Sequence, residues 1–319
     1  MFKTYIVTDD MDPKIAEYVL GDYSQVTFIP SPTEEDIIKN CKDADALISL
    51  YEPIGAKVMD NLPDLKLISL LSIGFDTIDI DYARKKNIYV SNNPNYCIEE
   101  VADHTVAFIL ALNRRLFEYN RAVKEEKIWQ YHNIKGNIHR LSKQTLGLAG
   151  FGKIAQNVAK RMKAFGCEIL AYDPYIDKEV GERYGVRMVS LDELLENSHI
   201  ISLHMPLNDS TKNFFNRDIF AKMKKSPIFI NCARGGVVDE EALLEALDKG
   251  WVSAAGLDVL STEEPDLENC EFVKRDNVIL TPHAAFYSVE SNEEAQILAA
   301  KHVEYFIKGQ LEKIPLIVK

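Results

Sequence analysis

The sequence predicts an α/β protein of two domains, each built on a doubly wound parallel sheet. The length of 319 residues is enough for two hydrophobic cores. Short apolar runs alternate with helically spaced apolar residues in residues 1–95, and again in residues 145–288. Repeated alternation of this kind is typical of a parallel sheet with helices on both faces. Ligands of such sheets bind beyond the carboxyl ends of the strands.

The first region contains five short apolar runs and four helical patterns. The apolar runs predict buried strands at 5–7, 26–29, 46–50, 67–70 and 88–90. The stretches between them predict helices at about 12–20, 34–41, 55–61 and 79–86. A glycine turn at residues 71–76 follows the fourth strand, and it is either an ordinary turn or a site whose backbone N–H groups hold a carboxylate.

A dinucleotide-binding fingerprint lies at the start of the second region. An apolar run ends in Gly150-x-Gly152-x-x-Ala155, a helical pattern follows, and a second apolar run ends at Asp173. Gly150 permits the tight turn, and Gly152 lets a pyrophosphate approach the free N–H groups of the helix N-terminus. Asp173 can bind the ribose hydroxyls and would repel a 2′-phosphate. These features predict a Rossmann domain that binds NAD.

The rest of the second region continues the alternation. One long helix is expected from about residue 98 to 127, and a closing helix is expected at 289–308. Six strands, the number in a complete Rossmann sheet, are predicted at 145–149, 168–172, 199–203, 228–231, 254–257 and 278–281.

Composition and charge exclude several function classes. The formal net charge of −12 argues against nucleic acid or an anionic membrane as the main partner. No apolar run approaches the length of a membrane-spanning helix, and the first residues lack a signal-peptide pattern. The five cysteines lack CxxC spacing, and His132 and His139 have no carboxylate or cysteine at ligand spacing. We therefore expect a cytoplasmic protein with reduced thiols and no metal.

Reactive side chains follow three strands of the second region. Arg234, Glu263 and His283 come after successive predicted strands. A histidine titrates near neutrality and can act as a general acid/base, and a neighbouring carboxylate keeps it protonated. A guanidinium matches a carboxylate bidentately. Taken singly, each residue also fits a surface or packing role. Beside a nucleotide fingerprint, the three together indicate hydride transfer between a 2-hydroxy acid and a 2-oxo acid.

Five motifs resemble those of the D-isomer-specific 2-hydroxyacid dehydrogenases, over essentially the whole chain. They cover residues 145–155, 205–207, 231–239, 257–263 and 281–283. The resemblance implies catalytic roles for Arg234, Glu263 and His283. Glu264 remains an alternative to Glu263, because the usual Glu-Pro is here Glu-Glu-Pro.

The resemblance also implies substrate and cofactor contacts. The amides of Ile73 and Gly74 would hold the substrate carboxylate, and the cofactor would contact Lys153, Ile154, Asp173, Met205, Pro206, Thr211, Cys232, Ala233 and Asp258, besides the fingerprint glycines.

The same resemblance implies a domain plan. Residues 1–98 and 289–319 would form a discontinuous, flavodoxin-like substrate domain, because family members return to their first domain at the end of the chain. Residues 99–288 would form the NAD-binding domain. The helix at 98–127 would supply much of a twofold homodimer interface.

Two functions remain open at this point. The favoured one is an NAD-dependent dehydrogenase of D-2-hydroxy acids; within the family, residues 283–288 and Tyr51 are similar to the D-lactate dehydrogenase branch. The alternative is an NAD-sensing interaction protein similar to the C-terminal-binding-protein corepressors, although we expect no disordered extension of the kind that suits a corepressor. Four aromatic residues either line the substrate pocket or pack a domain interface: Tyr51, Tyr96, Phe286 and Tyr287. An aromatic pocket predicts activity on several uncharged 2-oxo monoacids, and poor activity on oxaloacetate and 2-oxoglutarate.

Overall fold

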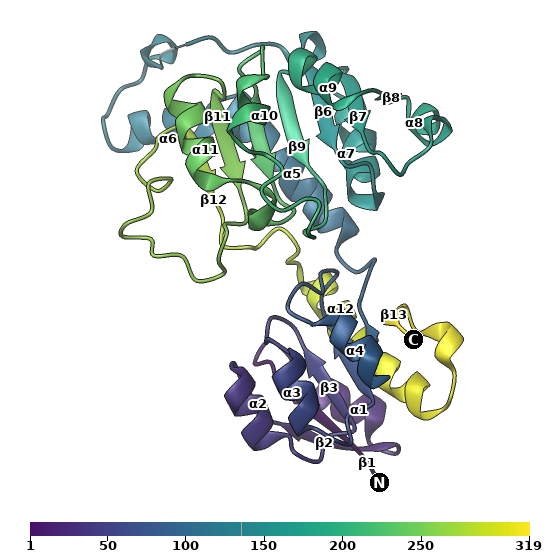
Figure 1. Cartoon of the computed structure of the whole chain (residues 1–319). Helices are drawn as coiled ribbons and strands as arrows, with labels where there is room; N and C mark the ends of the chain where they lie inside the picture. Colours follow the sequence, from purple (N-terminus) through teal and green to yellow (C-terminus); the bar gives the residue numbers. More distant parts are fainter. Residues whose placement is uncertain (135) are drawn as a thin grey trace. The chain divides into compact units, whose positions relative to one another are not determined.

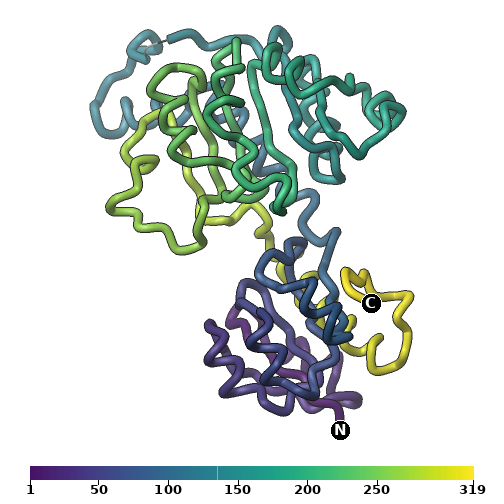
Figure 2. The backbone as a smooth tube through the Cα atoms, viewed as in Figure 1, coloured from purple at the N-terminus to yellow at the C-terminus, as the bar shows by residue number. Residues whose placement is uncertain are grey.

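The computed structural model describes residues 1–134 and 136–319, which form two compact units (Figures 1 and 2). Unit 1 consists of residues 1–96 and 287–319, and unit 2 consists of residues 97–286. The chain thus crosses between the units two residues before each predicted boundary. The first shift has a simple reason: a continuous helix begins at Ile98 and belongs to unit 2 as a whole.

Unit 1 contains a six-stranded sheet in the order β13-β5-β4-β3-β1-β2. All pairs are parallel except β13 with β5, so the parallel part has the flavodoxin-like order. The strands are β1 (Phe2–Ile6), β2 (Ser24–Phe28), β3 (Ala46–Ser49), β4 (Leu67–Leu70), β5 (Tyr89–Ser91) and β13 (Leu316–Val318). These bounds differ from the predicted ones by up to three residues.

The helices of unit 1 cover both faces of its sheet. They are α1 (Pro13–Leu20), α2 (Glu34–Asn40), α3 (Ala56–Asn61), α4 (Ile80–Lys86), α12 (Val289–Ile307) and the short 3₁₀ helix η4 (Leu311–Lys313). Helices α2, α3 and α4 pack against one another, whereas α12 packs against α1, β3 and β4. Because Asp12, Thr33, Asp79 and Ser288 each accept a backbone N–H of the first turn, four of these helices begin where the predicted patterns begin.

Unit 2 contains a seven-stranded parallel sheet in the order β12-β11-β10-β9-β6-β7-β8. The strands are β6 (Thr145–Ala149), β7 (Glu168–Tyr172), β8 (Arg187–Met188), β9 (Ile200–Leu203), β10 (Ile228–Asn231), β11 (Ala254–Leu257) and β12 (Val278–Leu280). This is the Rossmann order with one further strand. The prediction of six strands is wrong, because β8 has only two residues and is defined by its pairing with β7 rather than by an apolar run.

The prediction of one long helix over 98–127 is also wrong. The chain forms α5 (Ile98–Asn113) and α6 (Leu116–Lys124), with Arg115 in the left-handed region at φ 53°. The buried Asn113 side chain donates to the carbonyl of His139 at 3.3 Å and accepts from Gln144 at 2.7 Å. These bonds tie the end of α5 to a distant segment, so the helix ends there.

The remaining helices enclose the sheet of unit 2. They are α7 (Lys153–Lys163), α8 (Lys178–Tyr184), α9 (Leu191–Asn197), α10 (Arg217–Ala221), α11 (Glu240–Asp248), η1 (Tyr131–Asn133), η2 (Leu141–Lys143) and η3 (Gly235–Val237). Helix α5 packs on α7, β10 and β11, while α9, α10 and α11 share one hydrophobic cluster with the strands. No helix in the described part of the chain is long and apolar enough to cross a membrane.

Candidate active site

The carboxyl ends of the parallel strands of unit 2 meet at one edge of the sheet. The fingerprint turn follows β6, Asp173 follows β7, Met205 follows β9, Arg234 follows β10 and His283 follows β12. Predicted site residues that follow five different strands therefore lie along this edge, which is where ligands of doubly wound sheets bind.

The fingerprint turn has the geometry of a pyrophosphate site. Gly150 has φ 93°, and a Cβ there would lie 2.6 Å from the carbonyl oxygen of His204. A Cβ on Gly152 would meet no atom within 4 Å, so the space above this residue is open. Helix α7 begins at the next residue, Lys153, without a side-chain cap. An uncapped helix N-terminus of this kind suits an anion.

Asp173 holds the fingerprint turn from the end of β7. Its carboxylate accepts the N–H of Phe151 at 2.8 Å and the N–H of Tyr175 at 2.9 Å. Each carboxylate oxygen has a second lone pair, so these bonds leave capacity for ribose hydroxyls. The residues present thus fit the NAD that the fingerprint predicts.

The turn after β9 is fixed by Thr211. Its hydroxyl donates to the carbonyl of Pro206 at 2.6 Å and accepts the N–H of Asn208 at 2.9 Å. His204, which the sequence analysis did not single out, precedes this turn and bonds the Ser202 hydroxyl at 3.0 Å. Burial lowers the pKa of His204 to about 3, so this ring stays neutral at pH 7 and is a poor proton donor.

The segment after β10 is held by Asn231, a buried residue that the sequence analysis did not assign a role. Its side chain accepts the N–H of Ala233 and donates to the carbonyl of Arg234, both at 3.0 Å. A polar residue at the end of a predicted buried strand was the sequence signal that could have identified Asn231. Burial raises the pKa of the Cys232 thiol, so this thiol stays protonated. A Cβ on Gly235 would lie 1.8 Å from the carbonyl oxygen of Leu260, so only glycine allows these two segments to approach.

His283 forms a hydrogen-bonded pair with Glu263. The distance from His283 Nδ1 to Glu263 Oε2 is 2.8 Å, and the side chains are 19% and 53% exposed. The backbone of Glu264 instead donates to Thr262 at 3.2 Å. Of the two glutamates that the sequence left open, Glu263 is therefore the one beside His283. The ring of Phe286 lies edge-on to that of His283, with centroids 6.1 Å apart.

Asp258, directly after β11, organises the loop that carries His283. Its carbonyl accepts the N–H of His283 at 2.8 Å, and its carboxylate accepts the N–H groups of Ala284 at 2.8 Å and Ala285 at 3.0 Å. The carboxylate also accepts the hydroxyl of Thr281 at 2.5 Å. This buried side chain thus faces the loop, and its predicted contact with the cofactor remains a prediction.

The glycine turn of unit 1 presents free backbone donors. The carbonyl of Ile73 accepts from Asn92 at 2.6 Å, and the carbonyl of Gly74 accepts from Ser72 at 2.7 Å. The N–H groups of Ile73 and Gly74 donate to no acceptor among the residues that the structure describes. This arrangement suits a carboxylate. The four predicted pocket aromatics are divided between the units: Tyr51, Tyr96 and Tyr287 in unit 1 and Phe286 in unit 2.

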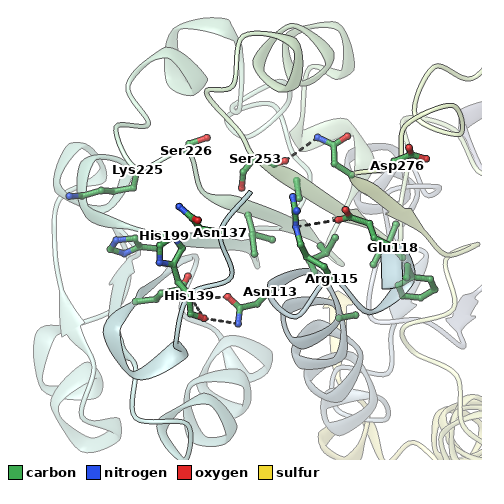
Figure 3. A pocket seen from close by; sticks show the side chains of 18 residues that line it. Asn113, Arg115, Glu118, Asn137, His139, His199, Lys225, Ser226, Ser253 and Asp276 are labelled. Atoms are coloured by element: carbon green, nitrogen blue, oxygen red, sulfur yellow. Dashed lines mark hydrogen bonds and ion pairs between the residues drawn. The ribbon is translucent and has the colours of Figure 1, made fainter. Parts of the chain in front are cut away.

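A polar cavity of about 340 Å³ lies at the opposite edge of the unit 2 sheet (Figure 3). Its walls include Ile228 and Ala254, the first residues of β10 and β11. Arg115 and Glu118 form an ion pair across 3.3 Å on one side of it. Because this cavity is at the amino ends of the strands, it is separate from the candidate active site. Over residues 1–134 and 136–319, no group of three or more His, Cys, Asp or Glu side chains is arranged to hold a metal ion.

Comparisons with known proteins show the family of the chain. Residues 106–285 match the NAD-binding domain of the D-isomer specific 2-hydroxyacid dehydrogenases. A glyoxylate reductase of Thermofilum pendens is 40% identical over 291 residues, which cover 88% of this chain and 83% of the relative. A D-3-phosphoglycerate dehydrogenase of Methanocaldococcus jannaschii is 37% identical over 96% of this chain, but the match spans only 58% of that relative.

A solved structure supports the same assignment. The D-lactate dehydrogenase of Aquifex aeolicus, crystallised with NAD and lactic acid, has a TM-score of 0.91 and 34% identity, with 99% of each chain covered. The fold and the strand-edge site thus define an NAD-dependent oxidoreductase. The chain belongs to the D-isomer specific 2-hydroxyacid dehydrogenase family.

Proposed function

We propose that this protein interconverts D-2-hydroxy acids and 2-oxo monoacids, with His283 as the general acid/base, Glu263 as its partner and Arg234 as the substrate-binding cation. The observation that carries the proposal is the 2.8 Å pair between His283 Nδ1 and Glu263 at the strand edge that holds the nucleotide fingerprint. Since Nδ1 is occupied, Nε2 is the ring atom that exchanges a proton with substrate.

The proposed reaction adds one hydride and one proton to the carbonyl group of a 2-oxo acid. NADH, when bound, supplies the hydride that reduces the carbonyl carbon. His283 Nε2 gives its proton to the carbonyl oxygen, which becomes the hydroxyl. Glu263 stabilises the protonated ring before this transfer, and Arg234 binds the carboxylate in a bidentate way and polarises the carbonyl. For the amides of Ile73 and Gly74, we keep the predicted role in carboxylate binding, because these N–H groups have no acceptor among the described residues.

For the substrate, we propose small uncharged 2-oxo monoacids, with glyoxylate and pyruvate tested first. The relatives named glyoxylate reductase and D-lactate dehydrogenase support this choice. The aromatic pocket of Tyr51, Tyr96, Phe286 and Tyr287 remains part of the proposal, and domain packing remains its alternative. D-3-phosphoglycerate, named for another relative, belongs in the assay as an oxidation substrate.

The decisive experiment is a turnover assay with NADH and a panel of 2-oxo acids, on wild type and two variants. His283→Ala should cut kcat by about 10²–10⁴-fold and leave NADH affinity within about threefold. His132→Ala, at an exposed histidine of unit 2, is the matched control and should keep full activity. A kcat of His283→Ala within a few-fold of the wild-type value would refute the mechanism. NADH binding without turnover of any acid would instead favour the NAD-sensing interaction protein.

We further propose a cytoplasmic homodimer whose interface includes α5 and α6. The cytoplasmic location is supported by the five cysteines, which are all free thiols. The dimer is supported by exposed apolar or aromatic side chains in this region: Leu116, Phe117, Trp129 and Tyr131. Exposed apolar residues gathered on one segment are typical of an interface. Light scattering at micromolar concentration should give twice the mass of the chain, and a monomer would contradict the dimer.

A further inference from the structure

His104, on α5, is hydrogen-bonded to the network that holds the catalytic loop. Its Nε2 lies 3.0 Å from the hydroxyl oxygen of Thr281 and 3.8 Å from Oδ1 of Asp258. The His104 side chain is 23% exposed, and that of Asp258 is 1% exposed. His104 and Thr281 are 177 residues apart in the sequence, so this contact exists only in the folded unit.

The directions of these bonds follow from the donor inventory. A threonine hydroxyl has one proton, and the Thr281 proton goes to the Asp258 carboxylate, which can only accept and lies 2.5 Å away. The Thr281 oxygen must then accept from His104. The proton on Nε2 of His104 is therefore required by the network, and a chain of donors runs from His104 through Thr281 to Asp258.

The loop at the end of this chain needs such support. His283 has φ 50°, a left-handed conformation that is strained for a residue with a Cβ. Three successive N–H groups, those of His283, Ala284 and Ala285, are bound by Asp258. The orientation of the His283 ring thus depends on the position of the Asp258 carboxylate.

The ring of His104 is itself fixed by packing. It lies edge-on to the ring of Phe108, with centroids 4.6 Å apart and an interplanar angle of 75°. Phe108 in turn lies against the backbone of β11, where a Cβ on Gly256 would be 2.9 Å from the phenyl ring. Asp258 follows this strand by one residue. Helix α5 and strand β11 therefore pack closely together next to the network of His104, Thr281 and Asp258.

We infer that His104 is a positioning residue of the catalytic loop, which acts through Thr281 and Asp258 to fix the orientation of His283. The inference rests on the proposed catalytic role of His283. The bond between His104 and Thr281 also connects the two segments of unit 2 that lead to unit 1, because α5 starts just after residue 96 and the loop ends at residue 286.

The test uses His104→Phe, which keeps the ring shape but removes the N–H donor, and His104→Gln, which restores a donor near the same place. We expect kcat to fall about tenfold in His104→Phe with KM for the 2-oxo acid within about threefold, because a positioning effect on the proton donor acts in the transition state. His104→Gln should recover most of the loss. Asp103→Asn, which removes an exposed ion pair with Arg161 on the same helix, is the control and should change kcat by less than about twofold.

A double-mutant cycle with Thr281→Val separates this chain of contacts from general damage to the helix. If His104 acts through the Thr281 hydroxyl, His104→Phe should cost almost nothing further in the Thr281→Val background. Full additivity, or a wild-type kcat in a folded His104→Phe, would overturn the inference. Should His104→Phe fail to fold, His104→Leu, which also lacks an N–H donor, replaces it in the cycle with Thr281→Val.

A second measurement does not need turnover. Hydrogen exchange at the amides of Ala284 and Ala285 should be about tenfold faster in His104→Phe than in wild type or Asp103→Asn. If wild type proves inactive, the proposed function fails, and this measurement still decides whether His104 holds the loop. Unchanged exchange at both amides would overturn the inference on its own.

Discussion

Replacing Gly235 by alanine should disrupt the active site through a clash that its neighbour Gly236 does not meet. A Cβ on Gly235 would lie 1.8 Å from the carbonyl oxygen of Leu260, whereas real Cβ contacts are not closer than 3.0 Å. The two backbone segments must therefore separate by about 1.2 Å, the difference between these distances. Glu263 lies three residues after Leu260, so this movement reaches the partner of His283.

The size of the effect follows from that displacement. Misplacing a catalytic group by about 1 Å costs about 10²-fold in rate, so kcat/KM of Gly235→Ala should fall about 100-fold. A Cβ on Gly236 would be 3.1 Å from Cδ2 of Leu207, the flexible end of a side chain. Gly236→Ala should therefore stay within about threefold of wild type. NADH binding and urea unfolding check that both variants are folded, and a folded Gly235→Ala with near wild-type kcat/KM would refute the reasoning.

Three further predictions concern substrate, cofactor and stability. Arg234→Lys should lower kcat/KM about 10–100-fold in steady-state assays, because an ammonium cannot form the bidentate pair. Asp173→Ala should lower the preference for NADH over NADPH about tenfold, measured as a ratio of kcat/KM values, and a wild type without that preference would contradict the cofactor assignment. Burial lowers the pKa of His302 on α12 to about 4, from about 6.5 in the unfolded chain. The unfolded state then binds more protons, so stability should fall by about 2 kcal/mol between pH 7 and pH 5 in urea titrations, and His302→Gln should lose clearly less.

The sequence predicted the features that depend on local patterns. The strands of both sheets other than β8 and β13, the turn at Gly150 and Gly152 and the helix that follows are defined by residues close in sequence. A parallel sheet brings its carboxyl ends together, so motifs far apart in the chain could be assigned to one edge from the order of strands and motifs alone.

The features that the sequence analysis got wrong or left out depend on distant partners. The break between α5 and α6 is set by bonds from Asn113 to a segment near Gln144, and the local spacing gives no sign of them. Strand β8 exists because two residues pair with β7. His104 lies on a helix for which the sequence predicted no role in the site, and its partner Thr281 is 177 residues away. None of these contacts has a local signature.

The catalytic loop combines both kinds of information. The motif that ends in His283 contains the residue that we propose as the acid/base, but the left-handed backbone of this histidine cannot be predicted from the motif. The conformation is imposed by Asp258, which accepts three N–H groups of the loop and directly follows the neighbouring strand β11. Replacing Asp258 should therefore move the loop backbone, whereas replacing a side chain that contacts only the substrate should not. If His283 is the proton donor and His104 supports its loop, as proposed above, the donor ring is oriented from β11 and α5 by residues that need not touch the substrate.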